Sequence, residues 1–308
     1  MERLTSEGGV PAHLRGAVIA LGNFDGFHLG HQAVVARAIE QARAEGRPAI
    51  VATFDPHPVR LFQPDAPPFR LTTLDQRERL FGAAGADAML VFHFDRELAS
   101  RTAAEFVAML AQDFGATGVV TGEDFTFGKG RSGSIAVLQE LGAPLGLTAE
   151  AVAPVTDDGG EVISSSRIRD ALMAGDCATA TRLLSRPFAI EGAVIHGDKR
   201  GRSIGFPTAN MELGPYLRPA YGIYAVRVHL PNERVIGGAA NLGIRPTFNP
   251  PKELLETYLF DFAGDLYGQT VEVALIERLR GEAKFETMDA LVAQMDADVA
   301  QARAILGQ

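Results

Sequence analysis

The chain of 308 residues carries 29 basic and 38 acidic side chains, a formal net charge of −9, and its length predicts two domains with separate cores. This acidic balance, with no basic tail, argues against nucleic acid as a partner, because nucleic-acid-binding proteins cluster lysine and arginine. No apolar run is long enough to cross a membrane, residues 1–11 lack the pattern of a signal peptide, and Cys177 has no second cysteine to pair with. We therefore expect a cytoplasmic globular protein.

Residues 1–186 alternate short apolar runs with segments of helical apolar spacing. The runs expected to form strands are 18–21, 49–54, 88–92, 117–121 and 147–152. Helices are expected from about residue 31 to Gly46, after the capping-box sequences that begin at Thr73 and Thr102, and over 134–141. This alternation predicts an α/β domain with a mostly parallel sheet and helices on both faces. Ligands of such sheets bind beyond the carboxyl ends of the strands.

The first apolar run leads into a glycine-rich turn and then into a helix. The turn is Gly22-Asn23-Phe24-Asp25-Gly26, and two histidines follow it, His28 and His31. Such a turn directs backbone N–H groups and the positive end of a helix dipole at one point, where a phosphate binds. Histidines three residues apart share a helix face, and each can donate to a phosphate oxygen. Alternatively, they form a metal pair, which needs a third ligand that no other motif supplies, or they are ordinary surface residues.

Three later loops also follow predicted strands or precede a helix. Two prolines stiffen the loop around His57, which is also consistent with a simple rigid turn. The loop 122–128 carries Phe125 and Phe127, and aromatic rings in a glycine-rich loop are poorly placed for core packing but suited to stacking on a planar ligand. The run 164–166 consists of three serines before a helix that carries Arg169, so it is either a helix cap or a second phosphate cradle.

From residue 187 onward, helical spacing gives way to short strand-like runs with turn residues between them. The strand candidates are 189–195, 223–229, 235–241, 256–260 and 270–275. This spacing predicts a small antiparallel β-barrel. Residues 288–306 have helical apolar spacing and are expected to pack on the barrel, with Met288 and Met295 in the core.

Two motifs in this second half contain residue types that suit ligand binding or catalysis. Residues 197–205 interleave glycines with basic side chains, as a phosphate-binding loop does. Thr208 and Asn210 then offer two oxygen ligands one residue apart, which suits Mg²⁺, although a hairpin loop explains this spacing equally well. Glu256 stands at the start of an otherwise apolar strand, where a lone carboxylate is usually solvated.

These motifs together resemble a known family. His28-Leu29-Gly30-His31 is similar to the HxGH motif of nucleotidylyltransferases, and residues 22–31 resemble bacterial bifunctional riboflavin kinase/FMN adenylyltransferases. Residues 164–169 are similar to the family's usual Ser-Ser-Thr-x-x-Arg, with Ser166 keeping the hydroxyl, and Pro207-Thr208-Ala209-Asn210 matches riboflavin kinases. The resemblance covers nearly the whole chain. It implies a Rossmann-like nucleotidylyltransferase domain over 1–186 and a riboflavin kinase β-barrel with a C-terminal helix over 187–308.

The resemblance also implies two reactions that both use ATP and Mg²⁺. Riboflavin is phosphorylated to FMN, and FMN is then adenylylated to FAD with release of pyrophosphate. In the first domain it implies catalytic roles for His28, His31 and Arg169. It implies nucleotide contacts at Gly22, Asn23, Phe24, Asp25, Gly26, His57, Ser164, Ser165 and Ser166, and flavin contacts at Phe62, Asp124, Phe125 and Phe127. Asp124 stands where some family members carry asparagine.

In the second domain, the resemblance implies that Glu256 accepts the proton of the riboflavin 5′-hydroxyl. Thr208 and Asn210 are then expected to bind the metal, with nucleotide contacts at Gly197, Lys199, Arg200, Gly201 and Gly205. The expected partners are the small molecules riboflavin, FMN and ATP, with no nucleic acid and no membrane, and the sequence does not reveal an oligomeric state.

Three other functions remain open. The first is a nucleotidylyltransferase for another phosphorylated substrate, such as phosphopantetheine, against which the kinase-like second half argues. The second is a flavin-binding module that has lost one or both activities, against which the retained polar residues argue. The third is a metallohydrolase built on His28 and His31, which bound zinc would favour.

Overall fold

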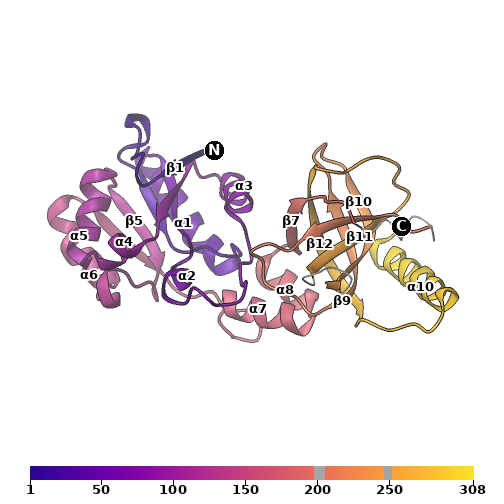
Figure 1. Cartoon of the computed structure of the whole chain (residues 1–308). Coiled ribbons are helices and arrows are strands. Elements are labelled where there is room, and N and C mark those ends of the chain that lie inside the picture. Colours follow the sequence, from indigo (N-terminus) through magenta and orange to yellow (C-terminus); the bar gives the residue numbers. More distant parts are fainter. Residues whose placement is uncertain (198–204, 246–251) are drawn as a thin grey trace. The chain divides into compact units, whose positions relative to one another are not determined.

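The computed structural model describes residues 1–197, 205–245 and 252–308 and divides into two compact units (Figure 1). The first unit comprises Met1–Pro67 and Thr72–Ser164, and the second comprises Pro68–Leu71 and Ser165–Gln308. The compact units therefore separate before Ser165, whereas the predicted boundary between the two activities, after residue 186, stays a prediction.

The first unit is built on a six-stranded sheet with the strand order β1-β4-β3-β2-β5-β6. All neighbouring strands pair in parallel, which confirms the predicted parallel α/β domain. The strands are β1 (Glu2–Thr5), β2 (Val18–Leu21), β3 (Ala49–Asp55), β4 (Ala88–His93), β5 (Gly118–Gly122) and β6 (Thr148–Val152). The sequence analysis did not predict β1, because this short edge strand is mostly exposed and has no apolar run.

Six α-helices connect the strands and cover both faces of this sheet. They are α1 (Leu29–Glu45), α2 (Pro58–Phe62), α3 (Leu74–Ala84), α4 (Arg96–Ser100), α5 (Ala103–Ala108), which continues as a π-helical turn over Met109–Asp113, and α6 (Ile135–Gly142). Both predicted capping boxes are present, at Thr73 and Thr102, and Gly46 ends α1 in the left-handed conformation. Alternate residues of β2 enter two separate apolar clusters, one on each face of the sheet.

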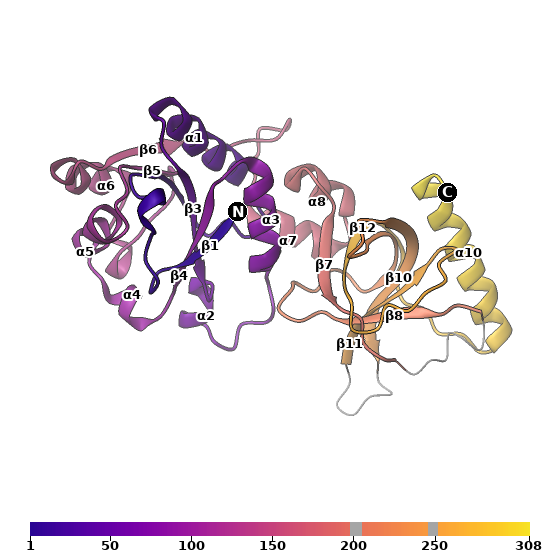
Figure 2. The ribbon, with the colours of Figure 1, turned by 90° about the horizontal axis from the view of Figure 1, so that it is seen from above.

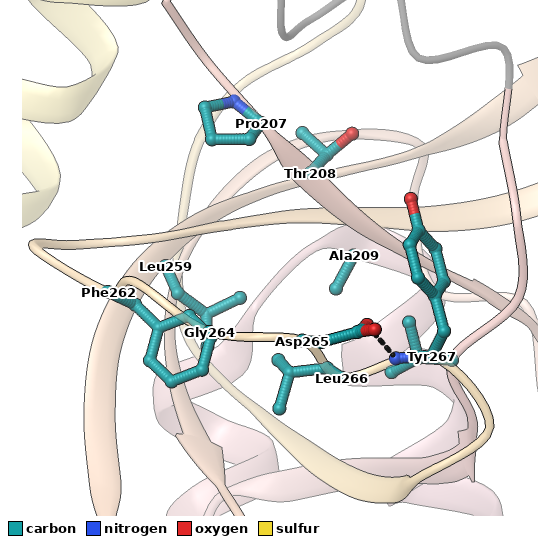
Figure 3. Close-up of a pocket in the computed structure, with 10 residues that line it drawn as sticks. Pro207, Thr208, Ala209, Leu259, Phe262, Gly264, Asp265, Leu266 and Tyr267 are labelled. Atoms are coloured by element: carbon teal, nitrogen blue, oxygen red, sulfur yellow. Dashed lines mark hydrogen bonds between the residues drawn. The ribbon is translucent and has the colours of Figure 1, made fainter.

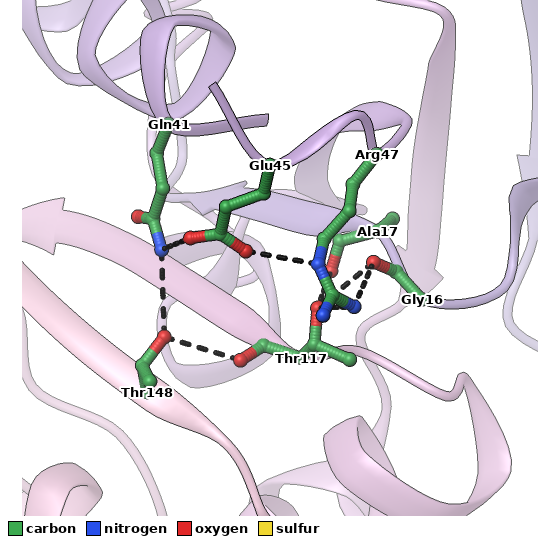
Figure 4. A network of polar contacts seen from close by, with 7 residues as sticks. All are labelled: Gly16, Ala17, Gln41, Glu45, Arg47, Thr117 and Thr148. Atoms are coloured by element: carbon green, nitrogen blue, oxygen red, sulfur yellow. Dashed lines mark hydrogen bonds and ion pairs between the residues drawn. The ribbon is translucent and has the colours of Figure 1, made fainter. Parts of the chain in front are cut away.

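A polar network ties the end of α1 to the amino ends of the central strands (Figure 4). Arg47 Nη1 donates to the Gly16 carbonyl at 3.2 Å and to Thr117 Oγ1 at 2.8 Å. On the last turns of α1, Gln41 Nε2 lies 3.5 Å from Thr148 Oγ1. Because these contacts fix the C-terminal end of α1 at one edge of the sheet, its N-terminus is held at the opposite, carboxyl edge.

The chain order creates a topological switch point beside β2. From β2 the chain proceeds to β3 and β4 on one side, and it later returns to place β5 and β6 on the other side. At such a point the connections leave neighbouring strands in opposite directions, which leaves a crevice at the carboxyl ends of the strands. The turn that precedes His28 follows β2, and the loop that carries Asp124 and Phe125 follows β5, so both border this crevice.

The second unit contains a six-stranded antiparallel sheet with the order β7-β12-β9-β10-β11-β8. A bridge between Ile195 and Asn210, closed by a 2.8 Å backbone hydrogen bond, brings the two outer strands together and curls the sheet into the predicted barrel (Figure 2). The strands are β7 (Phe188–Ala193), β8 (Thr208–Glu212), β9 (Gly222–His229), β10 (Val235–Arg245), β11 (Lys252–Leu259) and β12 (Thr270–Arg280). Strand β8 was not among the predicted strands, since its sequence was interpreted as a loop motif.

The described residues of the second unit form three α-helices, which are α7 (Ser165–Ala174), α8 (Cys177–Leu184) and α10 (Met288–Leu306). The predicted C-terminal helix is confirmed, and Figure 2 shows it beside the barrel strands. Its buried residues are Asp298, Ala302 and Leu306, and Asp298 Oδ2 accepts a hydrogen bond from Arg280 Nη2 at 2.6 Å. Met288 is 59 % exposed, so its predicted core position is wrong, because α10 packs mainly through its C-terminal half.

A short segment from the first half of the sequence also belongs to the second unit. Arg70 forms a parallel bridge with Tyr216. The Arg70 N–H donates to the Pro215 carbonyl at 3.2 Å, and the Leu217 N–H donates to the Arg70 carbonyl at 2.8 Å. Pro68–Leu71 therefore acts as a strap on the second unit, and we use this name for it below.

We predict that a fragment of residues 165–308 unfolds at a higher temperature than a fragment of residues 187–308. Helix α8 buries Leu183 and Leu184 at 0 % and 1 % exposure and packs against β7 and β12. Burying one leucine side chain contributes about 1.5–3 kcal/mol, which the shorter fragment loses twice. Thermal unfolding followed by circular dichroism tests this, with equal midpoints for the two fragments as the contradicting result. Both fragments lack the strap, so its absence does not affect the comparison.

Candidate active sites

The two motif histidines lie together at the start of α1. His28 is the N-cap residue, and its Nδ1 accepts a hydrogen bond from the His31 N–H at 3.3 Å. The two rings stack with their centroids 3.6 Å apart and an interplanar angle of 21°. The prediction that His28 and His31 lie on the same side at the start of this helix is therefore confirmed. Since Nδ1 is an acceptor, a neutral His28 carries its proton on Nε2, which is the ring nitrogen that can donate.

Gly30 leaves room for the His28 ring. A Cβ atom on Gly30 would lie 3.1 Å from Cε1 and 3.2 Å from Nδ1 of His28, closer than ordinary van der Waals contact. The same point is 3.5 Å from the carbonyl oxygen of Ile163, the residue before Ser164. The structure thus brings the beginning of the serine motif next to the start of α1.

Side chains from β3, α3 and the loop before α3 hold the glycine-rich turn. Arg77, which is 1 % exposed, donates from Nη1 to the Asn23 carbonyl at 3.1 Å and to Thr53 Oγ1 at 2.7 Å. The Thr72 N–H donates to Asp25 Oδ1 at 3.1 Å, and the Gly26 N–H donates to Thr72 Oγ1 at 2.9 Å. The sequence analysis missed Arg77, Thr53 and Thr72, because no local motif marks them.

The aromatic side chains of this turn belong to the core. Phe24 and Phe27 are 1 % and 4 % exposed, and both rings meet Phe81 edge-on, at centroid distances of 5.8 and 5.1 Å. Both residues, like Gly26, have positive φ angles, of 50° and 45°. The predicted nucleotide contacts of Phe24 and Asp25 stay predictions. Because both side chains are engaged in the turn and the core, these residues would contact a nucleotide through their backbone groups.

The predicted flavin residues occupy two different environments. Phe127 is 6 % exposed and packs on Phe106 with a centroid distance of 5.3 Å, so the interpretation that this ring is poorly placed for core packing is wrong. Phe125 stacks on Phe127 at 6.1 Å and is partly buried. Phe62, in contrast, is 69 % exposed at the end of α2, where its ring meets Phe94. His57 begins α2, and its Nδ1 accepts from the Val59 N–H at 3.2 Å.

Arg169, from the serine motif, lies on α7 in the second unit, as do Ser165 and Ser166. Its Nε donates to the Phe69 carbonyl at 2.9 Å, and its guanidinium carbon lies 5.4 Å from the centroid of the Phe69 ring. The strap therefore helps to position this predicted catalytic arginine, a contact that the sequence did not predict.

The predicted kinase residues gather on one face of the barrel. Asn210 of β8 is directly opposite Glu256 of β11, and Thr208 lies two residues before Asn210 on the same face. Asn210 is 5 % exposed, and a Cβ on Gly197 would lie 2.5 Å from its Nδ2, so glycine is required there. Gly205 has a φ angle of +89°. Lys199, Arg200 and Gly201 lie outside the described residues.

A pocket of about 80 Å³ adjoins Thr208 (Figure 3). Its lining residues are Val194, Pro207, Thr208, Ala209, Leu259, Phe262, Gly264, Asp265, Leu266 and Tyr267. The Tyr267 ring also contacts the His196 ring, at a centroid distance of 3.8 Å. The pocket combines apolar walls with the hydroxyls of Thr208 and Tyr267 and the carboxylate of Asp265, which suits the ring of an aromatic ligand beside polar groups.

The strand that carries Glu256 begins with an ionic network. Burial opposes ionisation of Glu253, but hydrogen bonds from Tyr221 and from Arg218 outweigh it and lower the pKa of Glu253. Burial and the adjacent Glu253 raise the pKa of Tyr221 to about 12. This network therefore holds an ionised carboxylate and a neutral phenol at neutral pH, and it anchors the start of β11.

Comparison with known proteins agrees with both halves of this geometry. The family model for FAD synthetase matches residues 10–167, and the model for riboflavin kinase matches residues 184–306. The fold and the two family models thus define a nucleotidylyltransferase-type α/β domain joined to a flavokinase-type barrel. The chain belongs to the family of bifunctional riboflavin kinase/FMN adenylyltransferases.

Individual relatives cover nearly the whole chain. The bifunctional riboflavin kinase/FMN adenylyltransferase of Escherichia coli K12 is 40 % identical over 95 % of this chain and 93 % of the relative. That of Pseudomonas fluorescens is 43 % identical over 96 % and 94 %. A crystal structure described as a macrolide-efflux protein from Streptococcus pneumoniae covers 97 % of both chains with 33 % identity and a TM-score of 0.86. Within the described ranges of the present chain, every helix is too short or too polar to span a bilayer.

We predict that Gly30→Ala lowers the expected adenylyl transfer to FMN, because the added methyl pushes the His28 ring away by a few tenths of an ångström. The loss should be smaller than the roughly 10²-fold effect of a 1 Å misplacement of a reacting group. Alanine is at least as good a helix former as glycine, so the melting temperature should not fall for that reason. Gly82→Ala is the matched control, since the nearest atom to its Cβ is Met1 Cβ at 3.5 Å. Equal transfer rates in Gly30→Ala and Gly82→Ala would contradict this account of Gly30.

Proposed function

We propose that this chain phosphorylates riboflavin to FMN in its barrel unit and adenylylates FMN to FAD in its α/β unit. The observation that carries the proposal is the presence of two separate polar sets in one chain. The stacked pair His28 and His31 lies at the N-terminus of α1, and Thr208, Asn210 and Glu256 lie on one face of β8 and β11. Membership in the bifunctional family supports both reactions.

In adenylyl transfer, an oxygen of the FMN phosphate attacks the α-phosphorus of ATP. A new P–O bond forms, the bond from the α-phosphorus to the bridging oxygen breaks, and pyrophosphate leaves. No covalent enzyme intermediate is needed, so the protein contributes alignment and stabilisation of negative charge. We assign this stabilisation to the N–H groups at the start of α1 and to the two histidines, with His28 donating from Nε2. We assign a further contact to Ser164, which ends the α/β unit, and the roles that the family resemblance gives to Ser165, Ser166 and Arg169 stay predictions.

We assign the flavin of this step to the carboxyl edge of the parallel sheet. Phe62 offers an exposed ring there, and Phe125 lies partly exposed above the buried Phe127. Stacking on such rings is how a planar isoalloxazine is held. Phe127 then supports Phe125 from the core, and Asp124 is exposed at the same loop.

In the kinase step, the 5′-hydroxyl oxygen of riboflavin attacks the γ-phosphorus of ATP. Glu256 accepts the hydroxyl proton, a P–O bond forms, the bond from the γ-phosphorus to the bridging oxygen breaks, and ADP leaves. Glu256 is half-buried and held in register by hydrogen-bonded strands on both sides, so its carboxylate is fixed by the sheet. Glu256 thereby has the placement that a general base needs.

The oxygens of Thr208 and Asn210 fit a Mg²⁺ ion, because both lie on one face of β8 and both are neutral acceptors. Among the described residues no three His, Cys, Asp or Glu side chains form a metal-binding group, so the ion would also depend on nucleotide phosphates. When bound, Mg²⁺ would neutralise charge on the transferred phosphoryl group. In this proposal Thr208 and Asn210 orient the ion and Glu256 moves the proton.

We predict that two single substitutions separate the activities. Glu256→Gln removes the proton acceptor with little change in shape, and should lower riboflavin phosphorylation by about 10²–10⁴-fold while FMN adenylylation is retained. His28→Asn removes the imidazole but keeps an N-cap oxygen for the His31 N–H, and should lower FMN adenylylation by about 10²–10³-fold while phosphorylation is retained.

The measurement is chromatographic separation of flavins after incubation with MgATP, with riboflavin or FMN supplied separately. Each variant serves as the control for the other, because both remain full-length. A variant that loses both activities, or neither of them, would contradict the assignment of that residue.

A further inference from the structure

An asparagine that the sequence analysis did not single out lies beside Glu256. Asn241 of β10 is the direct cross-strand partner of Glu256, whose partner on the other side is Asn210 of β8. Directly opposite residues of antiparallel strands point to the same face. Asn210, Glu256 and Asn241 therefore form one row of polar side chains across three adjacent strands.

The side-chain oxygen of Asn241 is buried, and in the described part of the chain it has no hydrogen-bond partner. A buried polar atom without a partner is destabilising, and native proteins retain few of them. Within this row, Asn241 is the residue with such a buried oxygen. A buried polar atom that lacks a partner in the protein is expected at a functional site, where a ligand supplies the hydrogen bond.

Two carboxylates from the described residues lie on the side of Asn241, and neither satisfies its oxygen. The oxygens of a carboxylate, such as those of Glu256, act as hydrogen-bond acceptors. Glu282 brings a second carboxylate close, since a Cβ on Gly243 would collide with its Oε1 and would also lie 3.5 Å from Asn241 Oδ1. Carboxylate oxygens donate no hydrogen bond, so the partner that Asn241 Oδ1 lacks is a donor from elsewhere.

We propose that Asn241 is a substrate-binding residue of the kinase site, whose side-chain oxygen accepts a hydrogen bond from a hydroxyl of the ribityl chain of riboflavin. This inference rests on the proposed kinase activity. A ribityl chain carries several hydroxyl donors next to the reactive 5′-hydroxyl. With Glu256 on the 5′-hydroxyl and Asn241 on a neighbouring hydroxyl, two adjacent strands fix the reacting oxygen in the direction of attack.

The test is Asn241→Ala in the full-length chain. Losing one hydrogen bond to the substrate should raise the KM for riboflavin about tenfold. The KM for ATP, the Mg²⁺ concentration for half-maximal rate and the adenylylation of supplied FMN should not change. The melting temperature without ligand should be unchanged or higher, because no hydrogen bond within the protein is lost, whereas the upward shift caused by riboflavin should shrink.

Thr257→Val is the matched control. Thr257 is the next residue after Glu256, is 1 % exposed, and also has a buried oxygen without a partner among the described residues, but its side chain points to the other face of β11. This variant removes a similar buried oxygen, and it should leave the KM for riboflavin at the wild-type value.

Binding of substrate analogues gives a second measurement, which would not change if Asn241 had only a structural role. At least one riboflavin analogue lacking a single ribityl hydroxyl should bind the wild type about tenfold more weakly than riboflavin, yet bind Asn241→Ala as riboflavin does. If Asn241→Ala fails to fold, as judged by loss of the barrel's thermal unfolding transition, Asn241→Ser with the same analogues replaces it.

Two results would overturn the inference. An unchanged KM for riboflavin would show that Asn241 does not contact this substrate. A raised KM for ATP or a raised Mg²⁺ requirement, with the KM for riboflavin unchanged, would place Asn241 on the nucleotide or the metal. If wild-type protein fails to phosphorylate riboflavin at all, the proposed kinase function itself fails, which is distinguishable from both results.

Discussion

The geometry of the α/β unit depends on one buried guanidinium. Arg77 is 1 % exposed and connects α3, through Nη1, to Thr53 on β3 and to the Asn23 carbonyl in the turn after β2. Burying a charged group is unfavourable unless hydrogen bonds compensate, so this residue is held firmly by the groups it binds. The turn that it fixes contains consecutive left-handed residues and delivers His28 to the N-cap of α1.

The barrel unit positions its polar groups by a different principle. Strand register, rather than a strained turn, sets the spacing of Asn210, Glu256 and Asn241. Groups on paired strands move little, which suits a reaction that needs an oxygen, a base and a phosphorus atom in line. Gly197 completes this arrangement, because the Asn210 amide packs where its Cβ would be.

Local sequence signals predicted most of the fold. The capping boxes at Thr73 and Thr102 and the left-handed Gly46 are local devices, and all three lie where the sequence indicated. Apolar runs likewise marked β2 to β5, because strands buried on both faces are continuously apolar. The edge strand β6 was also predicted, although its residues are partly or fully exposed. The exposed edge strand β1 lacks this signal. Strand β8 was missed because its Thr208 and Asn210 resemble loop residues and its pairing with β11 is distant in sequence.

Site residues that depend on distant packing were not predictable in the same way. Phe127 reads as a loop aromatic, and only its contact with Phe106 of α5 shows that it belongs to the core. Arg77 and Asn241 carry no motif, and their significance comes from what they do or do not contact after folding. The strap is a further case, because nothing in Pro68–Leu71 indicates pairing with residues 215–217.

The most direct measurement is a time course of the purified wild-type chain with riboflavin, ATP and Mg²⁺, with the flavins separated by chromatography. Two successive activities in one chain require FMN to appear first and FAD to follow as FMN is consumed. Accumulation of FMN alone would contradict the assignment of the α/β unit. Unchanged riboflavin, with separately supplied FMN also unchanged, would contradict both assignments.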